Sequence, residues 1–268
     1  MRTALTIAGS DSGGGAGIQA DLKTFAAHGV YGTSAITAIT AQNTVGVTAA
    51  QALPADFVIA QVEAVASDIG VHAVKTGMLP NAAIVEAVAA VIAALELPFV
   101  VVDPVMIAKS GDALVDDEAI GAIKGSLLER AHTVTPNIPE AEALSGITIR
   151  TDADRREAAR RIHAMGPATV IVKGGHLDAP VIRDLLFDGH EFHEFEAERV
   201  PGTNTHGTGC TFAAALASHL ALGRTLPEAI PLAQHYIAGA IRAGIAVGRG
   251  HGPMDHFWRH HADRAGRL

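Results

Sequence analysis

Short apolar runs alternate along the chain with longer segments of helical periodicity. The apolar runs predict strands at Thr3–Ala8, Thr33–Thr40, Val71–Thr76, Phe99–Asp103, Thr133–Thr135 and Thr169–Lys173. The periodic segments predict helices at Ala16–His28, Asp56–Ser67, Asn81–Leu95, Asp116–Leu128, Asp152–Met165, Cys210–Leu222 and Leu226–Val247. Because strands that alternate with helices form βα units, we expect an α/β fold on a mainly parallel sheet.

One segment departs from this alternation. Val181–Phe187 and Glu191–Phe195 flank Asp188-Gly189, a dipeptide that favours a hairpin turn. We expect a small antiparallel hairpin there. No linker, repeat or low-complexity tract divides the sequence, so residues 1–268 are predicted to form a single domain.

The composition is that of a globular protein with no broad cationic surface. Apolar residues make up 49% and charged residues 18%, and the formal net charge is −8. A negative balance argues against nucleic acid as the main partner. The single cysteine, Cys210, excludes an intramolecular disulfide and suits a reducing compartment.

The apolar stretches are too short or too interrupted for a membrane span. Glu86, Glu96 and Pro98 break the run from Ala82 to Val102. The apolar run near the start is shorter than a secretory signal requires. We therefore expect a cytoplasmic protein with no membrane partner.

The turn that follows the first predicted strand, Gly9–Gly17, is rich in glycine. In open parallel sheets ligands bind beyond the carboxyl ends of the strands, and glycines let the backbone approach a ligand closely. The segment fits only a permissive dinucleotide fingerprint and lacks the Gly-Lys-Ser/Thr ending of a Walker loop. It is either a ligand-binding loop or a tight turn.

The helix predicted next carries a carboxylate within its apolar stripe. Asp21 lies between Ile18 and Phe25 on the face expected to be buried. A buried carboxylate needs partners. Asp21 therefore either grips a ligand beside the glycine loop or lies at the stripe edge and reaches solvent.

The next two loops offer an amide and an acid. The primary amide of Gln42 could pair with a ring nitrogen and an exocyclic amine, as amides do when they read a base edge. Asp103, at the end of a valine run, could organise a metal or phosphate. The alternatives are an ordinary polar loop residue and a turn-forming Asp-Pro.

Two further strand ends suggest a nucleotide site. Asn137 and Glu140 are spaced either for water-mediated magnesium binding or for a helix capping box. Lys173, beside Gly174-Gly175, is either a phosphate ligand or an exposed lysine.

The segment Thr205–Cys210 leads directly into a predicted apolar helix. Free N–H groups of the loop and first helical turn would converge there into an anion hole. The same field is expected to lower the pKa of the Cys210 thiol, which would make the thiolate a proton acceptor. The alternative is a buried, inert cysteine, but the Gly-Thr-Gly sequence favours the functional interpretation.

Taken together, these segments resemble the hydroxymethylpyrimidine/phosphomethylpyrimidine kinases of thiamine biosynthesis. The matching segments are Ala8–Thr24, Ala41–Thr44, Lys75–Leu79, Asp103–Met106, Lys109–Gly111, Thr135–Glu140, Lys173–His176, Asn204–Cys210 and Gly250–Pro253. The match ends near His256, so residues 257–268 are expected to be an unrelated extension. The resemblance implies a three-layer ribokinase-like fold, in which helices flank a mainly parallel sheet.

The resemblance also implies roles for individual residues and a homodimer. The pyrimidine is expected to contact Gly9, Asp21, Gln42, Met78 and Val105. ATP and Mg²⁺ are expected near Asp103, Asn137, Glu140, Lys173 and Thr208, with Asp103 and Glu140 binding the metal through water. The catalytic residues are expected to be Cys210, Gly207, Thr208, Gly209 and Lys173. The family has this cysteine where most ribokinase-like sugar kinases have an aspartate.

Two other functions remain open. A pyridoxal kinase would also phosphorylate a hydroxymethylated heteroaromatic ring, although Gln42 favours an aminopyrimidine. A non-catalytic nucleotide-binding module would use the glycine loop and leave Thr205–Cys210 unexplained.

Residues 108–112 are a candidate lid, since a closing loop would exclude water from the transfer site.

Overall fold

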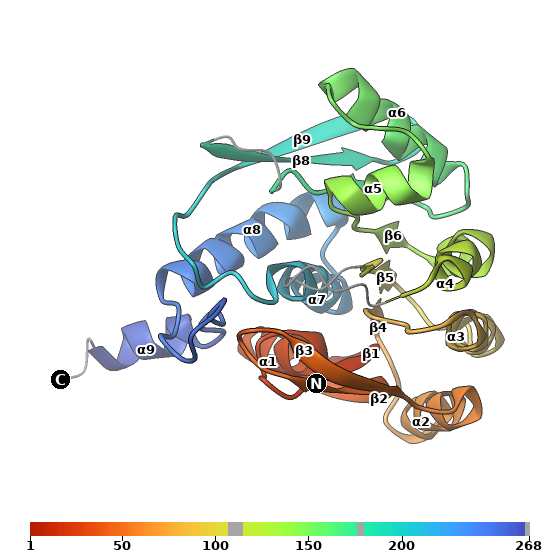
Figure 1. The fold of residues 1–268 in the computed structure, drawn as a ribbon, viewed down its shortest axis with the longest axis horizontal. Coiled ribbons are helices and arrows are strands. Elements are labelled where there is room, and N and C mark those ends of the chain that lie inside the picture. The colour runs from red at the N-terminus through yellow and green to blue at the C-terminus, as the bar shows by residue number, and fades with distance from the viewer. Residues whose placement is uncertain (107–114, 176–179, 266–268) are drawn as a thin grey trace.

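The computed structural model describes residues 1–106, 115–175 and 180–265, which fold around one twisted sheet (Figure 1). Its strands are β1 (Thr3–Asp11), β2 (Tyr31–Gln42), β3 (Val47–Ala52), β4 (Ala73–Thr76), β5 (Val100–Val102), β6 (Thr133–Val134), β7 (Val170–Val172), β8 (Val181–Phe187) and β9 (Phe192–Glu198). Their spatial order is β3-β2-β1-β4-β5-β6-β7-β8-β9. The central strands β2, β1, β4, β5, β6 and β7 are parallel. β3 at one edge and β8 and β9 at the other are antiparallel.

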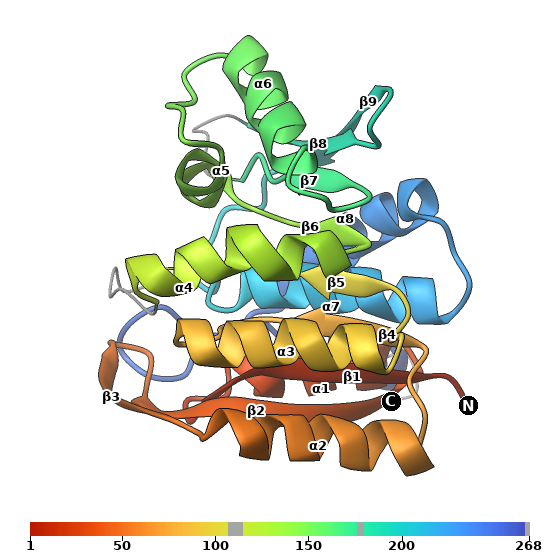
Figure 2. The ribbon, with the colours of Figure 1, turned by 90° about the vertical axis from the view of Figure 1, so that its right-hand side faces the viewer.

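Helices cover both faces of this sheet. They are α1 (Gly17–Ala27), α2 (Ala55–Asp68), α3 (Ala82–Ala94), α4 (Asp117–Ala122), α5 (Ile138–Ser145), α6 (Asp152–His163), α7 (Thr208–Ala221), α8 (Leu226–Arg242) and α9 (Trp258–Ala265). A π turn at Ile123–Leu127 and a 3-10 turn at Leu128–Arg130 prolong α4. Figure 2 shows α2, α3 and α4 in front of the strands, and Figure 1 shows α1, α7 and α8 on the opposite face. The predicted three-layer α/β fold is confirmed.

The valine run of β5 shows why the sheet is buried on both faces. Val100 and Val102 pack into the core beneath α3, and Val101 packs into the core beneath α7. Successive side chains of a strand point to opposite faces, so an unbroken apolar run suits a central parallel strand. The run therefore places the carboxyl end of β5, and with it Asp103, in the middle of the sheet edge.

The predicted hairpin is present, and its second strand extends to Glu198. The turn is closed by Asp188 Oδ1, which accepts hydrogen bonds from the N–H groups of His190 and Glu191. Gly189 adopts φ +94°, a conformation that favours glycine.

Several elements differ from the sequence prediction, and α5 was not among the predicted helices. β3 was missed because its alanine-rich edge strand is mostly exposed and has no apolar alternation. The last long helix ends at Arg242 rather than near residue 247, because the chain then turns so that Gly250 lies against the backbone of Thr44. α9 was not predicted, and its Trp258 donates a hydrogen bond to the Tyr236 carbonyl on α8. Among the described residues, no helix has the length and apolarity needed to span a bilayer.

His219, on α7, is buried against the half-buried His28 at the end of α1. His219 is 6% exposed, and within the described residues neither of its ring nitrogens has a hydrogen-bond partner. Its ring lies edge-on to that of His28, with the centroids 4.9 Å apart. Burial lowers the pKa of both side chains, to about 4 for His219. Both histidines are therefore neutral in the folded protein near pH 7.

We predict that these histidines make the fold sensitive to acid. A depressed folded-state pKa contributes stability above the unfolded value near 6.5, and this stability is lost as the pH falls toward 4. Each histidine can change the free energy of unfolding by up to about 1.4 kcal/mol per pH unit. Urea denaturation of His219→Leu between pH 7 and 4.5 should show a shallower loss of stability than the wild type. An equal effect of His190→Gln, at an exposed position, would contradict this explanation.

Candidate active site

A cavity of about 600 Å³ opens at the carboxyl ends of the parallel strands. The predicted site residues that line it are Gly9, Gln42, Met78, Asp103, Val105, Asn137, Glu140, Lys173, Gly207, Thr208, Gly209 and Cys210. They lie at or just beyond the carboxyl ends of β1, β2, β4, β5, β6 and β7, or at the start of α7. The expectation that chemistry collects beyond the strand ends is confirmed.

The glycine loop is organised by the last residue of β1, Asp11. Its carboxylate accepts hydrogen bonds from the N–H groups of Gly13, Gly15 and Ala16 at 2.7–3.0 Å. Burial alone would raise the pKa of Asp11, but a hydrogen bond from His206 together with these N–H groups lowers it. Asp11 therefore remains an ionised acceptor that fixes the loop. From the sequence alone, Asp11 is identified only as part of the glycine-rich segment Gly9–Gly17.

Gly9 and Met78 form one wall for a flat ligand. A Cβ atom at Gly9 would lie within 2.4 Å of the Met78 Cε atom, so the thioether packs directly on the glycine backbone. Thr37 fixes the adjoining backbone by donating a hydrogen bond to the Met78 carbonyl at 2.7 Å. A polarisable sulfur at the cavity wall suits contact with an aromatic ring.

Asp21 does not line this cavity. It is fully buried, accepts a hydrogen bond from Thr6 Oγ1 at 2.6 Å, and forms an ion pair with Lys75 Nζ at 2.9 Å. Although burial alone would lower the pKa of Lys75, the charge of Asp21 raises it, so the lysine remains charged. Both sequence interpretations of Asp21, as a ligand-gripping acceptor and as a solvent-reaching residue, are therefore corrected: its partner is an internal lysine.

The segment Thr205–Cys210 forms the predicted turn into a helix, but α7 begins at Thr208, two residues earlier than expected. Gly207, at φ +82°, caps the helix, and a Cβ atom there would collide with the Gly15 carbonyl oxygen. The first N–H groups of a helix have no acceptor in a preceding turn. Residues 207–210 line the cavity beside the glycine loop, and the Thr208 N–H donates to the Thr205 carbonyl at 3.3 Å, so this helix start is a candidate anion site.

Cys210 lies in the first turn of α7, half-buried, and its electrostatics differ from the prediction. Burial raises the pKa of its thiol to about 11. The charge of Lys75 opposes this rise, whereas the carboxylates of Asp103 and Asp21 add to it. The predicted lowering of the thiol pKa is therefore wrong, because desolvation and nearby acids outweigh the helix field.

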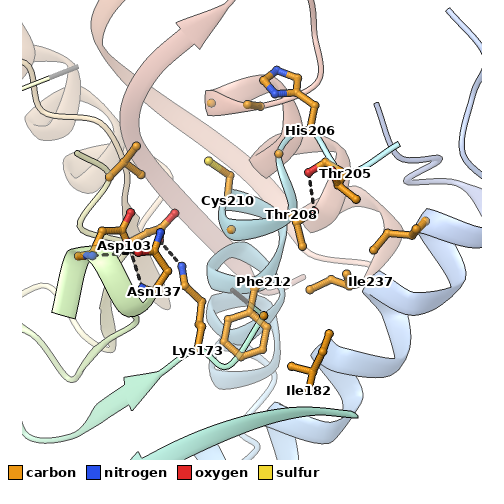
Figure 3. Close-up of a pocket in the computed structure, with 18 of the residues that line it drawn as sticks. Asp103, Asn137, Lys173, Ile182, Thr205, His206, Thr208, Cys210, Phe212 and Ile237 are labelled. Atoms are coloured by element: carbon orange, nitrogen blue, oxygen red, sulfur yellow. Dashed lines mark hydrogen bonds and ion pairs between the residues drawn. The ribbon is translucent and has the colours of Figure 1, made fainter. Parts of the chain in front are cut away.

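Lys173 and Asp103 form an ion pair beside the start of α7. Lys173 Nζ lies 3.0 Å from Asp103 Oδ1, and a Cβ atom at Gly209 would come within 3.4 Å of the same ammonium group. Figure 3 shows Lys173 reaching toward Asp103 beside the start of α7. Lys173 is 14% exposed, which contradicts the alternative of a freely exposed lysine.

Asn137 and Glu140 form the capping box of α5. Asn137 Oδ1 accepts from the Glu140 N–H at 2.9 Å, and Glu140 Oε2 accepts from the Asn137 N–H at 2.8 Å. Burial raises the pKa of Glu140 to about 7, with Lys173 opposing and Asp103 reinforcing the rise. Capping does not exclude a second role, because both residues also line the cavity.

The apolar half of the cavity was not anticipated from the sequence. Its walls come from the hairpin, α7 and α8, at Ile182, Val200, Phe212, Ile237, Ala238 and Ile241. Figure 3 shows Ile182, Phe212 and Ile237 around this space. Buried Asp184 supports its rim by accepting hydrogen bonds from the Gly174 N–H and from Gln234. No motif marks such a surface, since these positions look like ordinary core residues.

Across residues 1–106, 115–175 and 180–265, no cluster of three or more His, Cys, Asp or Glu side chains could hold a metal ion by itself. The candidate lid at residues 108–112 lies outside the described residues.

A mainly parallel sheet, an anion site at a helix start, a charged pair beside it and an apolar cleft together define a ribokinase-like small-molecule kinase. A family model described as phosphomethylpyrimidine kinase matches residues 11–255. The chain belongs to the phosphomethylpyrimidine kinase family.

Two curated relatives show how far this similarity extends. The thiamine biosynthesis bifunctional protein of Geobacter sulfurreducens is 54% identical over 253 residues, which are 94% of this chain and 52% of that protein. The chain thus spans about half the length of that relative. The hydroxymethylpyrimidine/phosphomethylpyrimidine kinase of Streptomyces coelicolor is 50% identical over 254 residues, covering 95% of this chain and 94% of the relative.

Solved structures agree with the fold. The ADP complex of Bacillus subtilis pyridoxal kinase has a TM-score of 0.90 at 40% identity, covering 97% of this chain and 99% of that one. The phosphomethylpyrimidine kinase of Clostridium difficile has a TM-score of 0.81 at 44% identity, covering 90% of this chain and 100% of that one.

Proposed function

We propose that this chain transfers the γ-phosphoryl group of ATP to the hydroxyl of 4-amino-5-hydroxymethyl-2-methylpyrimidine, and then phosphorylates the monophosphate to the diphosphate in thiamine biosynthesis. The observation that carries the proposal is the candidate anion site at the start of α7. The wall formed by Gly9 and Met78 and the Asp103–Lys173 ion pair line the same cavity. The names of the curated relatives support this choice of acceptor.

In this proposal the nucleotide binds in the apolar half of the cavity. Its base would contact Ile182, Phe212 and Ile237, and its phosphates would extend toward Lys173. Apolar walls with a few placed polar groups are typical of cofactor clefts. Nucleotide binding at a related fold is supported by the ADP complex of the Bacillus subtilis pyridoxal kinase.

A magnesium ion fits beside Asp103 and Glu140. Asp103 Oδ2 is buried and has no hydrogen-bond partner among the described residues, so it can accept from a water of a hydrated cation. Mg²⁺ commonly retains several waters and contacts one or two carboxylates together with substrate phosphates. When bound, the ion would neutralise phosphate charge.

Catalysis then rests mostly on positioning and charge stabilisation. The N–H groups of Gly207, Thr208 and Gly209 would hold the transferring phosphoryl oxygens, and Lys173 would stabilise the charge that develops. The thiolate form of Cys210 would accept the proton of the hydroxymethyl group in the first transfer. The monophosphate acceptor is already ionised near pH 7, so the second transfer needs no base.

This assignment predicts different effects of Cys210→Ala on the two transfers. Because the thiol pKa is about 11, the thiolate fraction rises about tenfold per pH unit below that value. The wild-type rate with the alcohol should increase from pH 7 to 9, and the substitution should remove this increase and lower the rate by about 10²-fold. The rate with the monophosphate should change little. Equal losses with both acceptors would contradict the assignment of Cys210 as base.

Pyridoxal kinase activity is the second candidate, and it is favoured by the similarity to the Bacillus subtilis pyridoxal kinase. Mass analysis of products formed from MgATP with hydroxymethylpyrimidine, its monophosphate or pyridoxal distinguishes the two. We also propose a cytoplasmic homodimer that has no nucleic acid partner, and sedimentation analysis tests the dimer.

A further inference from the structure

His206 connects three parts of the cavity, and the mechanism above does not use it. Its Nε2 atom lies 2.8 Å from Asp11 Oδ2 and 3.4 Å from Gln42 Nε2. His206 belongs to the loop before α7, Asp11 to the end of β1, and Gln42 to the end of β2. Its side chain is 12% exposed and lies at the cavity wall (Figure 3).

Asp11 determines which ring nitrogen of His206 carries a proton. Its carboxylate already accepts three backbone N–H groups and is held ionised, so it offers only acceptor oxygens. The His206 nitrogen facing it must therefore be an N–H donor. The Gln42 amide lies beside the same N–H. Electrostatics therefore favour the orientation that points the amide oxygen at His206 and disfavour the one that points the amide N–H₂ at it.

Thr40 imposes the same orientation from the other end of the amide. Its hydroxyl lies 2.8 Å from the Ser10 carbonyl oxygen, to which it donates, and 3.1 Å from Gln42 Oε1. A hydroxyl has one proton, and the carbonyl can only accept it. A half-turn of the amide that places its nitrogen beside Thr40 and its oxygen beside His206 satisfies both neighbours.

In that orientation the amide has one N–H and one lone pair left over. Since Gln42 lines the cavity, these two groups are available to a bound ring. A 4-aminopyrimidine presents a complementary pair, a ring nitrogen that accepts and an adjacent amino group that donates. In pyridoxal the carbons beside the ring nitrogen carry a methyl group and a hydrogen, with no amino group, so only one of the two hydrogen bonds can form.

We propose that His206 is a specificity-determining positioning residue, which orients the Gln42 amide so that the pocket selects an amino group next to a ring nitrogen. This inference rests on the proposed function for the identity of the natural substrate. The ring preference itself can be measured without any phosphoryl transfer.

The test compares calorimetric binding of 4-amino-5-hydroxymethyl-2-methylpyrimidine with that of its analogue lacking the 4-amino group. The wild type should prefer the amino compound by about 10²-fold, because a site built to bond a polar group rejects a ligand without it. His206→Ala should reduce this preference about tenfold. His206→Gln, which keeps an N–H donor, should retain most of it. Adding His206→Ala to Gln42→Ala should cause no further reduction.

Lys23→Ala is the matched control, because Lys23 Nζ braces the glycine loop from outside by donating to the Gly14 carbonyl at 2.7 Å. It should weaken both ligands equally and leave the preference unchanged. The proposal is overturned if the wild type shows no preference, if His206→Ala keeps the full preference, or if Lys23→Ala reduces it as much. A wild type that shows the preference but phosphorylates neither compound with MgATP would overturn the proposed function alone.

Discussion

Lys173→Met should lower kcat by about 10³-fold with both the alcohol and the monophosphate acceptor. The ammonium group is held 3.0 Å from Asp103 and close to Gly209 at the start of α7, where the phosphoryl charge would develop. Methionine keeps the length and apolar stem of the side chain but removes its charge. Steady-state kinetics with each acceptor measure the effect.

The control for this substitution is Lys173→Arg, which keeps the charge and should retain more activity than the methionine variant. The methionine variant also leaves Glu140 and Asp103 without their cation. Its thermal unfolding must therefore be compared with that of the wild type to show that the loss is catalytic. A folded Lys173→Met protein with kcat within threefold of the wild type would refute the role of Lys173 in transfer.

Lys75→Met should lower the free energy of unfolding by about 3–5 kcal/mol. Both members of the Lys75–Asp21 pair are fully buried, and removal of the lysine leaves a carboxylate whose one remaining hydrogen-bond partner among the described residues is Thr6. Breaking one half of a buried pair is costly because the remaining charge stays desolvated. Urea denaturation measures the loss.

Two further variants separate this explanation from a simple packing defect. Addition of Asp21→Asn to Lys75→Met removes the unpaired charge and should recover much of the lost stability. Arg183→Met breaks the exposed pair between Arg183 and Glu196 and should cost less than about 1 kcal/mol. If Lys75→Met costs no more than Arg183→Met, the buried pair does not stabilise the fold.

The sequence predicts the parallel sheet and most of the cavity because both depend on local patterns. The Val100–Val102 run identifies a central strand, and the polar residue that follows it must then lie at the strand end. The same reasoning places Gln42 and Lys173 correctly. Each conclusion requires only the order of strands and loops along the chain.

The errors at Asp21 and Cys210 arise from contacts between distant segments. Asp21 lies 54 residues from Lys75, and the two meet because β1 pairs with β4. Helical periodicity places Asp21 on a face but cannot name its partner. The pKa of Cys210 depends on burial and on Asp103, which the sequence does not place against it. The walls of the apolar half of the cavity were missed for the same reason, because they come from separate segments of the chain.

The most direct test of the central claim is mass analysis of the product formed from MgATP and 4-amino-5-hydroxymethyl-2-methylpyrimidine. The proposed function predicts a monophosphate that is converted into a diphosphate when ATP remains in excess. Pyridoxal should be phosphorylated much more slowly. Efficient phosphorylation of pyridoxal, with no product from the aminopyrimidine, would contradict the account.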